Sequence, residues 1–359
     1  MSAAPGTGAS GPAPIAVGER LLGTGNPCFV IAEAGSNHNG SLEQALRLVD
    51  VAARAGADAV KFQVFRADRL YPRDAGQTEY LKLDTPIHEV IAAMEMPYAW
   101  LETLAARCTE LGIEFMASAF DAESVDWIDP FVRLHKVASY ELAHHPLIRH
   151  VAAKGKPLLL STGTSDLDEV AESLDVWRAA GGAGVALLQC TAAYPAPLAA
   201  LNVAAVTGLR ERFGTPTGLS DHSRDPVVGP VAAVALGACV VEKHFTLSND
   251  LPGPDHAFAL EPRELALMVR RIRETEEALG SADKAIHPVE HELRAFARPS
   301  LFTARAIPAG AAFANDDVVV LRKGAHADGL HPRELARVLA ARAARDLPTG
   351  TPLAEGDLA

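Results

Sequence analysis

Short apolar runs alternate with alanine-rich stretches of helical periodicity between residue 28 and about residue 280. Runs rich in β-branched residues predict strands at 28–33, 58–64, 114–118, 134–139, 157–161, 185–190, 216–220 and 239–244. The stretches that follow them predict helices at 41–55, 97–111, 122–128, 145–154, 166–180, 202–213, 226–236 and 262–279. Strands that alternate with helices are typical of right-handed βαβ units and a parallel sheet. Eight such units in about 250 residues favour a (β/α)8 TIM barrel of the α/β class over an open doubly wound sheet.

The chain from residue 296 onward has a different pattern, with short runs, turn signals and one helical stretch at 332–343. It also contains an internal repeat, because the segment 304–310 recurs forty residues later as 344–350. A strand, a Pro-x-Gly turn and a second short strand, used twice, predict a small pseudo-symmetric β-rich module.

This change of pattern and the length of 359 residues predict more than one domain. We expect a disordered tail at 1–16, a barrel domain at 17–282, a linker at 283–299 and the β-rich module at 300–359.

The first fifteen residues are small, uncharged and rich in Pro and Gly, and the first basic residue is Arg20. The basic start and apolar block of a secretory signal are therefore missing.

Composition narrows the possible partners. With 48% hydrophobic and 22% charged residues and a net charge of −12, the chain favours neither nucleic acid nor an anionic membrane as a partner. No apolar run approaches the roughly 18 residues of a membrane span.

The four cysteines are widely spaced and suit reduced thiols in a cytoplasmic protein: Cys28, Cys108, Cys190 and Cys239. Cys190 has no histidine close by in sequence to activate it, so we expect it to have a packing role.

Polar residues gather where the predicted strands end. In a TIM barrel the active site lies at the carboxyl ends of the strands and on the loops that follow. The residues at these ends are Glu33, Lys61, Gln63, Ser118, Lys136, Ser139, Glu141, Ser161, Thr191, Ser220, Asp221, His222, Glu242 and His244. A solvated loop end is also polar, so no single residue is decisive. The convergence of Lys, His and Glu on one barrel mouth is what predicts an active site.

Two histidines in this group are placed to share a metal ion. His222 and His244 come from the ends of adjacent predicted strands, and Glu242 shares a strand face with His244. Two neutral imidazoles suit Mn²⁺, Fe²⁺, Co²⁺ or Zn²⁺ and leave positions open for water and a substrate oxygen. The alternative is a hydrogen-bonded core pair, which the adjacent strand ends and acidic neighbours disfavour.

Lysines and hydroxyls in the same group form a candidate cradle for an anion. Lys61 and Lys136 supply compact positive charges, and Ser118, Ser139 and Ser161 supply hydrogen-bond donors to a phosphate or carboxylate. A strand-end lysine can instead be a solvated cap or an ion-pair partner. It can also be a Schiff-base nucleophile, which would indicate a pyruvate aldolase.

The segments that hold these residues resemble the sialic acid synthase family, from about residue 28 to the C-terminus. The matching segments are IAEAGSNHNG at 31–40, VKFQ at 60–63, KVASYE at 136–141, LSTG at 160–163, LQCT at 188–191, YP at 194–195, GLSDHS at 218–223, VEKHF at 241–245 and PGPD at 252–255. The tail from Ser300 resembles the antifreeze-like (SAF, β-clip) module that closes these synthases.

The resemblance implies a barrel, a divalent metal ion and a domain-swapped homodimer in which the tail module of one subunit covers the barrel mouth of the other. The implied metal is Mn²⁺, with Mg²⁺ or Co²⁺ as alternatives, and its ligands are His222 and His244. The residues implied to hold phosphoenolpyruvate are Lys61, Ser118, Lys136, Ser139, Ser161 and Ser220. Those implied to contact the acceptor sugar are Gln63, Tyr194, Asp255 and, from the partner's tail, the arginine at position 322 (Arg322). The candidates to position or deprotonate water are Glu33, Glu141 and Glu242, of which Glu33 also faces the sugar.

The implied reaction condenses phosphoenolpyruvate with an aldose, N-acetylmannosamine or a close analogue, to give a sialic-acid-type 2-keto acid and phosphate. Alternatives are the same chemistry on mannose, a diamino-sugar, or a phosphorylated or pathway-specific aldose, and a sugar-binding scaffold without turnover. One departure from the family is that Ala192 and Ala193 follow the Cys-Thr pair, where Asn or Ser is common. The missing donor predicts weaker phosphate binding or an altered acceptor pocket.

Overall fold

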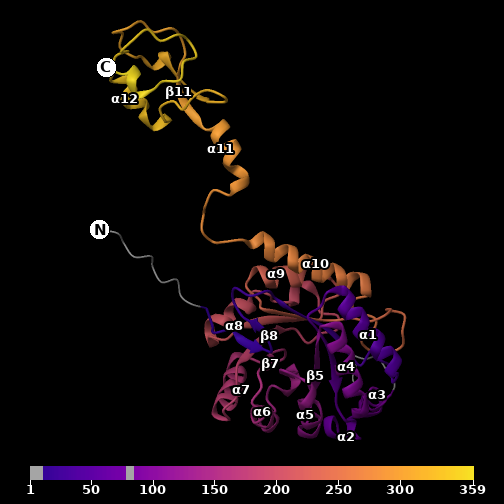
Figure 1. Cartoon of the computed structure of the whole chain (residues 1–359). Coiled ribbons are helices and arrows are strands. Elements are labelled where there is room, and N and C mark those ends of the chain that lie inside the picture. The colour runs from indigo at the N-terminus through magenta and orange to yellow at the C-terminus, as the bar shows by residue number, and fades with distance from the viewer. Residues whose placement is uncertain (1–10, 78–84) are drawn as a thin grey trace. The chain divides into compact units, whose positions relative to one another are not determined.

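The predicted alternation of strands and helices closes into a barrel in the first of two units, Met1–Gly280 and Ser281–Ala359. The computed structural model describes residues 11–77 and 85–359 (Figure 1). The barrel has eight parallel strands in the order β10-β3-β4-β5-β6-β7-β8-β9. They are β3 (Phe29–Gly35), β4 (Ala59–Val64), β5 (Glu114–Ala119), β6 (His135–Val137), β7 (Leu158–Ser161), β8 (Val185–Cys190), β9 (Thr217–Asp221) and β10 (Val240–His244). The predicted fold class and all eight strands are confirmed.

Helices surround this barrel, and the eight predicted ones are confirmed. They are α1 (Leu42–Ala55), α4 (Leu101–Leu111), α5 (Ala122–Ile128), α6 (His145–Ala152), α7 (Leu167–Ala179), α8 (Ala205–Phe213), α9 (Val228–Ala235) and α10 (Pro262–Leu279). Their ends have local causes. The Ser41 side chain accepts a hydrogen bond from the backbone N–H of Gln44 at the start of α1, and Gly56 ends that helix with φ 81°.

Shorter elements depart from the prediction. The described part of the connection between β4 and α4 contains two helices that the sequence pattern did not indicate, α2 (Ala67–Leu70) and α3 (Ile87–Ala93). Strand β6 is shorter than predicted because the chain turns at Ala138 into the 3₁₀ helix η3 (Ser139–Glu141). The remaining 3₁₀ helices of the first unit are η1 (Tyr98–Trp100), η2 (Asp129–Phe131) and η4 (Leu198–Ala200).

The barrel interior is apolar toward the amino-terminal ends of its strands. The buried side chains of this layer are Phe29, Ile31, Ala59, Met116, Leu134, Leu159, Ala186, Leu188, Cys239 and Val240. Ile15, Val17 and Leu22 join them from the hairpin β1 (Ile15–Val17)–β2 (Arg20–Leu22). Ile15 and Ala16 therefore belong to a strand and not to the predicted disordered tail, because Ile15 is buried in the barrel cluster. Residues 1–10 of that tail lie outside the described residues.

Side chains two residues apart on a strand share a face. The residue two positions after each apolar one therefore also points inward, and it carries a polar group or a thiol. Ile31 is followed by Glu33, Ala59 by Lys61, Met116 by Ser118, Leu134 by Lys136, Leu159 by Ser161, Leu188 by Cys190, Gly218 by Ser220 and Val240 by Glu242. One step of strand alternation thus changes the barrel interior from an apolar core to a ring of polar side chains.

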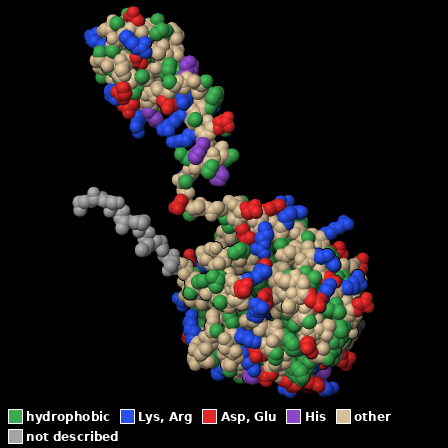
Figure 2. Space-filling model, viewed as in Figure 1, with side chains coloured by type: hydrophobic (Ala, Val, Ile, Leu, Met, Phe, Trp, Pro, Cys, Tyr) green, Lys and Arg blue, Asp and Glu red, His purple; other side chains and the backbone are tan. Residues whose placement is uncertain are grey.

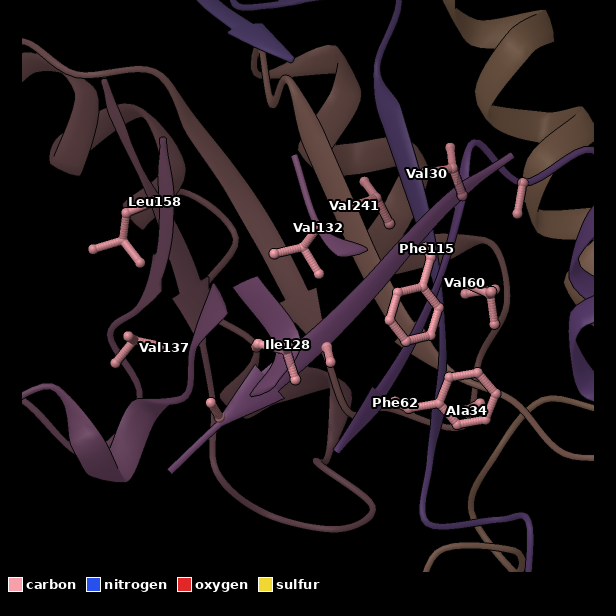
Figure 3. Close-up of a cluster of buried hydrophobic side chains, with 14 of the residues drawn as sticks. Val30, Ala34, Val60, Phe62, Phe115, Ile128, Val132, Val137, Leu158 and Val241 are labelled. Atoms are coloured by element: carbon pink, nitrogen blue, oxygen red, sulfur yellow. The ribbon is translucent and has the colours of Figure 1, made fainter. Parts of the chain in front are cut away.

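Outward-facing strand residues pack against the helices. These residues form the largest hydrophobic cluster of the first unit, part of which is drawn in Figure 3. The figure shows Val30, Val60 and Val241 from three neighbouring strands, together with Phe62 and Phe115. The rings of Phe62 and Phe115 are stacked, with centroids 6.2 Å apart. Burial of such side chains, at about 1.5–3 kcal/mol each, holds the strands in the register that the site requires.

The second unit contains the predicted repeat. Helix α11 (His291–Ala297) precedes β11 (Pro299–Thr303), which pairs antiparallel with β12 (Val318–Arg322). The 3₁₀ helices are η5 (Pro288–Glu290), η6 (Asn315–Asp317), η7 (Pro332–Glu334) and η8 (Glu355–Asp357), and α12 (Leu335–Leu339) is shorter than the predicted helical stretch.

The two copies of the repeat meet at an antiparallel bridge between Ile307 and Leu347. Each copy has the same ion pair, Arg305 with Asp317 and Arg345 with Asp357. The repetition in sequence is therefore a repetition of contacts.

On the visible face of the first unit, acidic and basic side chains are interspersed (Figure 2). Although the whole chain has a net charge of −12, this face shows no single acidic area. Among the helices of residues 11–77 and 85–359, none is long and apolar enough to cross a membrane.

Candidate active site

A small cavity of about 50 Å³ lies at the carboxyl ends of the barrel strands; we call it the inner cavity. Its wall consists of Glu33, Lys61, Gln63, Ser118, Lys136, Ala138, Ser139, Tyr140, Ser161, Cys190, Tyr194, Ser220, His222, Glu242 and His244. Every barrel strand contributes to it or leads into a loop that does. The predicted convergence of Lys, His and Glu on one mouth is confirmed.

Strand register decides which of these side chains are neighbours. Glu33 is paired in register with Lys61 on one side and with His244 on the other. Glu242 is likewise paired with Ser220. Cross-strand partners on one face have Cβ atoms about 5 Å apart, so opposite charges placed there meet.

Two lysines and two glutamates form a buried charge network. Lys61 Nζ lies 2.7 Å from Glu33 Oε2, 2.8 Å from Ser118 Oγ and 3.5 Å from Glu242 Oε1. Lys136 Nζ lies 3.6 Å from the same Glu242 oxygen. Since none of these four residues is more than 4% exposed, the charges interact with little screening by water.

The network sets the protonation of its members. Burial raises the pKa of Glu33 to about 7, although Lys61 opposes the shift. Burial also acts to raise the pKa of Glu242, but the ammonium groups of Lys136 and Lys61 outweigh it and lower that pKa. Burial lowers the pKa of Lys136, whereas for Lys61 the two glutamates overcome burial and raise it. Near neutral pH, Glu242 is thus ionised and Glu33 titrates.

The two predicted metal ligands face the same part of the inner cavity. The ring centroids of His222 and His244 are 5.4 Å apart. His222 Nδ1 lies 3.0 Å from the carbonyl oxygen of Thr191, which orients that nitrogen as a donor and leaves Nε2 as the acceptor. Tyr194 lies against the His222 ring at 4.2 Å between centroids.

His244 shows that this pair fits a divalent cation. Its Nδ1 is buried and has no hydrogen-bond partner among residues 11–77 and 85–359. Asp255 Oδ2 lies 3.7 Å away. Burial holds the pKa of His244 well below its ordinary value, which keeps the imidazole in the neutral form that ligates metals. Within the described residues no group of three or more His, Cys, Asp or Glu side chains is arranged as a metal site, so a bound ion needs water or substrate as further ligands.

An outer cavity of about 520 Å³ adjoins the inner one and shares Gln63, Ala138, Tyr140, Tyr194 and His244 with it. Its other wall residues are Phe65, Leu70, Tyr71, Ile87, Val90, Ile91, Met94, Phe120, Ala192, Pro254 and Asp255. Helices α2 and α3 supply much of this apolar wall. Burial raises the pKa of the Asp255 carboxyl to about 6. The volume suits a small organic ligand.

Two predicted site residues lie outside both cavities. Glu141 is buried on η3, where burial raises its pKa to about 7, but it lines neither cavity. Arg322 is the last residue of β12 in the second unit and is exposed there. Its predicted contact with a sugar stays a prediction.

Tyr140, Phe258 and Cys190 are among the residues of the site that were not predicted. Tyr140 lines both cavities, and Phe258 packs on Tyr194 and His244 with centroids 5.4 and 5.2 Å away. Cys190 Sγ lies 3.8 Å from His222 Nδ1 although 32 residues separate them in sequence. The inward alternation of β8 was the signal for Cys190, since it occupies the same layer as Ser161 and Ser220.

A closed parallel barrel with a charged cavity at the carboxyl ends of its strands has the architecture of a TIM-barrel enzyme. The chain belongs to the NeuB family, whose model matches residues 48–284, and a SAF domain matches residues 298–359. The resemblance to sialic acid synthases with a C-terminal SAF module is therefore confirmed.

Known relatives match nearly the whole chain. The spore coat polysaccharide biosynthesis protein SpsE of Bacillus subtilis is 40% identical over 360 residues, which cover 95% of this chain and 96% of the relative. N,N'-diacetyllegionaminic acid synthase of Legionella pneumophila is 38% identical over 345 residues, covering 94% and 96%. The crystal structure of the Bacillus subtilis SpsE protein has a TM-score of 0.66 at 39% identity, covering 97% of this chain and 99% of that chain. The chain is thus related to synthases of nonulosonic acids.

Proposed function

We propose that the chain condenses phosphoenolpyruvate with an aldose that carries an acetamido group, N-acetylmannosamine or a close analogue. C3 of phosphoenolpyruvate bonds to the aldehyde carbon, whose oxygen becomes a hydroxyl. Water adds at C2, and the C2–O bond to phosphate breaks, which gives a nonulosonic 2-keto acid and inorganic phosphate. The observation that supports this most is the single cavity in which two buried lysines, serine hydroxyls and two histidines meet.

Lys61 and Lys136 are the proposed binding groups for the anionic donor. Both ammonium groups approach the same Glu242 oxygen, at 3.5 and 3.6 Å, and therefore point to one place. Ser161 Oγ is buried and has no hydrogen-bond partner within the described residues, so it can donate to a donor oxygen. Ser118, Ser139 and Ser220 complete the predicted cradle. Charge-assisted hydrogen bonds from lysine persist as charge moves from the enol ester to phosphate.

His222 and His244 are the proposed ligands of a divalent metal ion, with Mn²⁺ as our expectation and Mg²⁺ or Co²⁺ as alternatives. The unpartnered Nδ1 of His244 and the Thr191 tether of His222 support this role. When bound, such an ion supplies Lewis acidity that polarises the acceptor carbonyl.

Glu33 is the proposed proton-transfer group. A pKa of about 7 is matched to general acid–base work near neutral pH. Glu242 is held ionised by the lysines and is better suited to orient them. Glu141, the third candidate, lines neither cavity and is not proposed to handle the water.

The outer cavity is the proposed acceptor site, with Gln63, Tyr194 and Asp255 as polar contacts. Its apolar wall favours an acceptor with an acetamido methyl group over mannose, whose substituents are all hydroxyls. The relative named N,N'-diacetyllegionaminic acid synthase makes a product with two acetyl groups, which supports this preference. Ala192 lines this cavity and not the inner one, so the missing donor alters the acceptor pocket rather than phosphate binding.

We further propose a homodimer in which Arg322 of one subunit contacts the acceptor in the other. Mixed dimers test this arrangement. Lys61→Met and Arg322→Ala chains should each be inactive alone, and co-expressed heterodimers should regain activity, since one of their two sites contains both wild-type residues. Heterodimers as inactive as the parents would contradict the shared site.

Phosphate release tests the reaction itself. Phosphoenolpyruvate and Mn²⁺ are supplied with N-acetylmannosamine, a diacetamido aldose, mannose or the 6-phosphates, with and without EDTA. We expect acceptor-dependent, EDTA-sensitive release that is fastest with the acetamido sugars. Absence of phosphate release, together with EDTA-resistant borohydride trapping of pyruvate on a lysine, would favour the Schiff-base aldolase. Sugar binding without release from any acceptor would indicate a scaffold.

A further inference from the structure

A buried ion pair lies on the outer side of the two strands that carry the histidines. Lys243 and Asp221 are 1% and 0% exposed, and the distance from Lys243 Nζ to Asp221 Oδ2 is 2.7 Å. Lys243 alternates with Glu242 and His244 along β10 and does not line the inner cavity. The Asp221 carboxylate faces α9, because a Cβ atom added to Gly229 would lie 2.7 Å from its Oδ2.

The same lysine also holds the turn after β9. Lys243 Nζ donates to the carbonyl oxygen of Ser223 at 2.5 Å and contacts Ser223 Oγ at 3.2 Å. Asp221 Oδ1 accepts the backbone N–H of Ser223 at 2.7 Å. Since His222 lies between Asp221 and Ser223, its backbone is held on both sides by this one group of bonds.

Position along the chain links the pair to the candidate metal ligands. Asp221 directly precedes His222, Lys243 directly precedes His244, and Asp221 and Lys243 are partners in the register of β9 and β10. A bond between these two residues fixes the separation of the strand ends from which both imidazoles project.

Fold stability alone does not account for this arrangement. Removing two charges from water is costly, and apolar residues of similar volume often serve a protein interior as well or better. Residues that orient the ligands of a metal, in contrast, typically change its affinity about 10–100-fold when they are replaced.

We propose that Lys243 is a positioning residue that holds the Asp221–Ser223 turn so that His222 and His244 face one point of the inner cavity. The inference rests on the proposed metal role of these histidines. It assigns to Lys243 no contact with substrate or with the reacting atoms.

The test is direct Mn²⁺ binding to the full-length protein, measured by electron paramagnetic resonance of free Mn²⁺ without substrate. We expect Lys243→Met to bind Mn²⁺ about 10–100-fold more weakly, while phosphoenolpyruvate binding, measured separately by calorimetry, changes less than threefold. The matched control is Lys156→Met. Lys156 pairs with Asp129 at 2.9 Å just before β7, at the opposite end of the barrel, so its loss should leave Mn²⁺ affinity unchanged.

A second variant separates positioning from folding. Lys243→Met/Asp221→Asn removes both buried charges and should melt higher than Lys243→Met, yet still bind Mn²⁺ weakly because the bond to the Ser223 carbonyl is lost. If the wild type binds Mn²⁺ and both variants bind it within twofold of that affinity, the positioning role is wrong. If the wild type itself binds no Mn²⁺, the proposed metal role fails and this inference fails with it.

Discussion

The inner and outer cavities share a wall but are built in different ways. The inner cavity is lined by one or two residues at the end of each barrel strand, and lysines, glutamates, serines and histidines predominate. The outer cavity takes most of its remaining wall from the connections that follow the strands, and apolar side chains such as Ile87, Ile91 and Met94 predominate. The comparison teaches that strand register assembles the chemistry, whereas the connections decide which molecule fits beside it.

Replacing Lys61 should have the largest effect. Lys61→Met should lower kcat/KM about 10³-fold, because the donor loses a charged partner within a cavity that excludes water. Glu33 and Glu242 lose their shared cation as well, so the free energy of unfolding should fall by about 3–5 kcal/mol. Steady-state kinetics and chemical denaturation measure the two effects. A variant with near-normal kinetics would remove Lys61 from the proposed donor site.

Glu33→Gln should lower kcat about 10²-fold or more, as expected when a proton-transfer group is lost. In the wild type, activity should rise as pH increases through about 7, where Glu33 ionises. The variant should lack this ascending limb. A pH–rate profile of both proteins is the measurement, and an unchanged limb in Glu33→Gln would assign the titration to another group.

Glu141 provides a buried carboxyl outside both cavities. Its pKa is raised from 4.5 to about 7. Its favourable contribution to the free energy of unfolding is therefore complete below pH 4.5 and is lost as pH rises through 7. Glu141→Gln does not ionise and should therefore be more stable than the wild type at pH 8, by up to about 3 kcal/mol, but not at pH 4.5. Catalysis should change little. Denaturation at both pH values checks the sign, and a large loss of kcat would place Glu141 at the reacting centre.

A substitution in the wall of the outer cavity should change the preference of the enzyme between two acceptor sugars. Met94→Gln keeps the length of the side chain but makes the wall polar, so the preference for N-acetylmannosamine over mannose should fall about tenfold. The KM for phosphoenolpyruvate should stay the same. Competition between the two acceptors measures the ratio, and an equal change in both kcat/KM values would show that the wall does not select the acceptor.

Ala192→Asn restores the side chain common in the family and should have the smallest effect. Because Ala192 lines the outer cavity and not the inner one, we expect a change of about threefold in the KM of the acceptor, roughly what one added hydrogen bond contributes. A larger change in the KM of phosphoenolpyruvate would mean that residue 192 reaches the donor after all.

Much of the fold and of the inner cavity was predictable from sequence. Strand alternation places the inward residues two apart, and parallel strands in a barrel bring their carboxyl ends together. Knowing that Glu33, Lys61 and Glu242 lie toward the carboxyl ends of their strands was therefore enough to predict that they meet. Cys190 was missed because a cysteine at a strand end is more often a packing residue. Tyr140 was missed because it follows its strand on η3.

The outer cavity was not predictable in the same way. Helices α2 and α3 are short, and the apolar pattern of Ile87–Ala93 is too brief to show which face of that helix it covers. The repeat in the second unit was visible in sequence because each copy carries the same Arg–Asp pair.

Periodicity and strand order were enough to predict the barrel, the module that follows it and most of the polar side chains at the barrel mouth. Three features came from the folded molecule instead: Glu33 and Glu242 differ in protonation, Glu141 lies outside both cavities, and Lys243 is bonded to Asp221 on the neighbouring strand. These features depend on distance and burial in three dimensions. Neither quantity can be read from the spacing of residues along a chain.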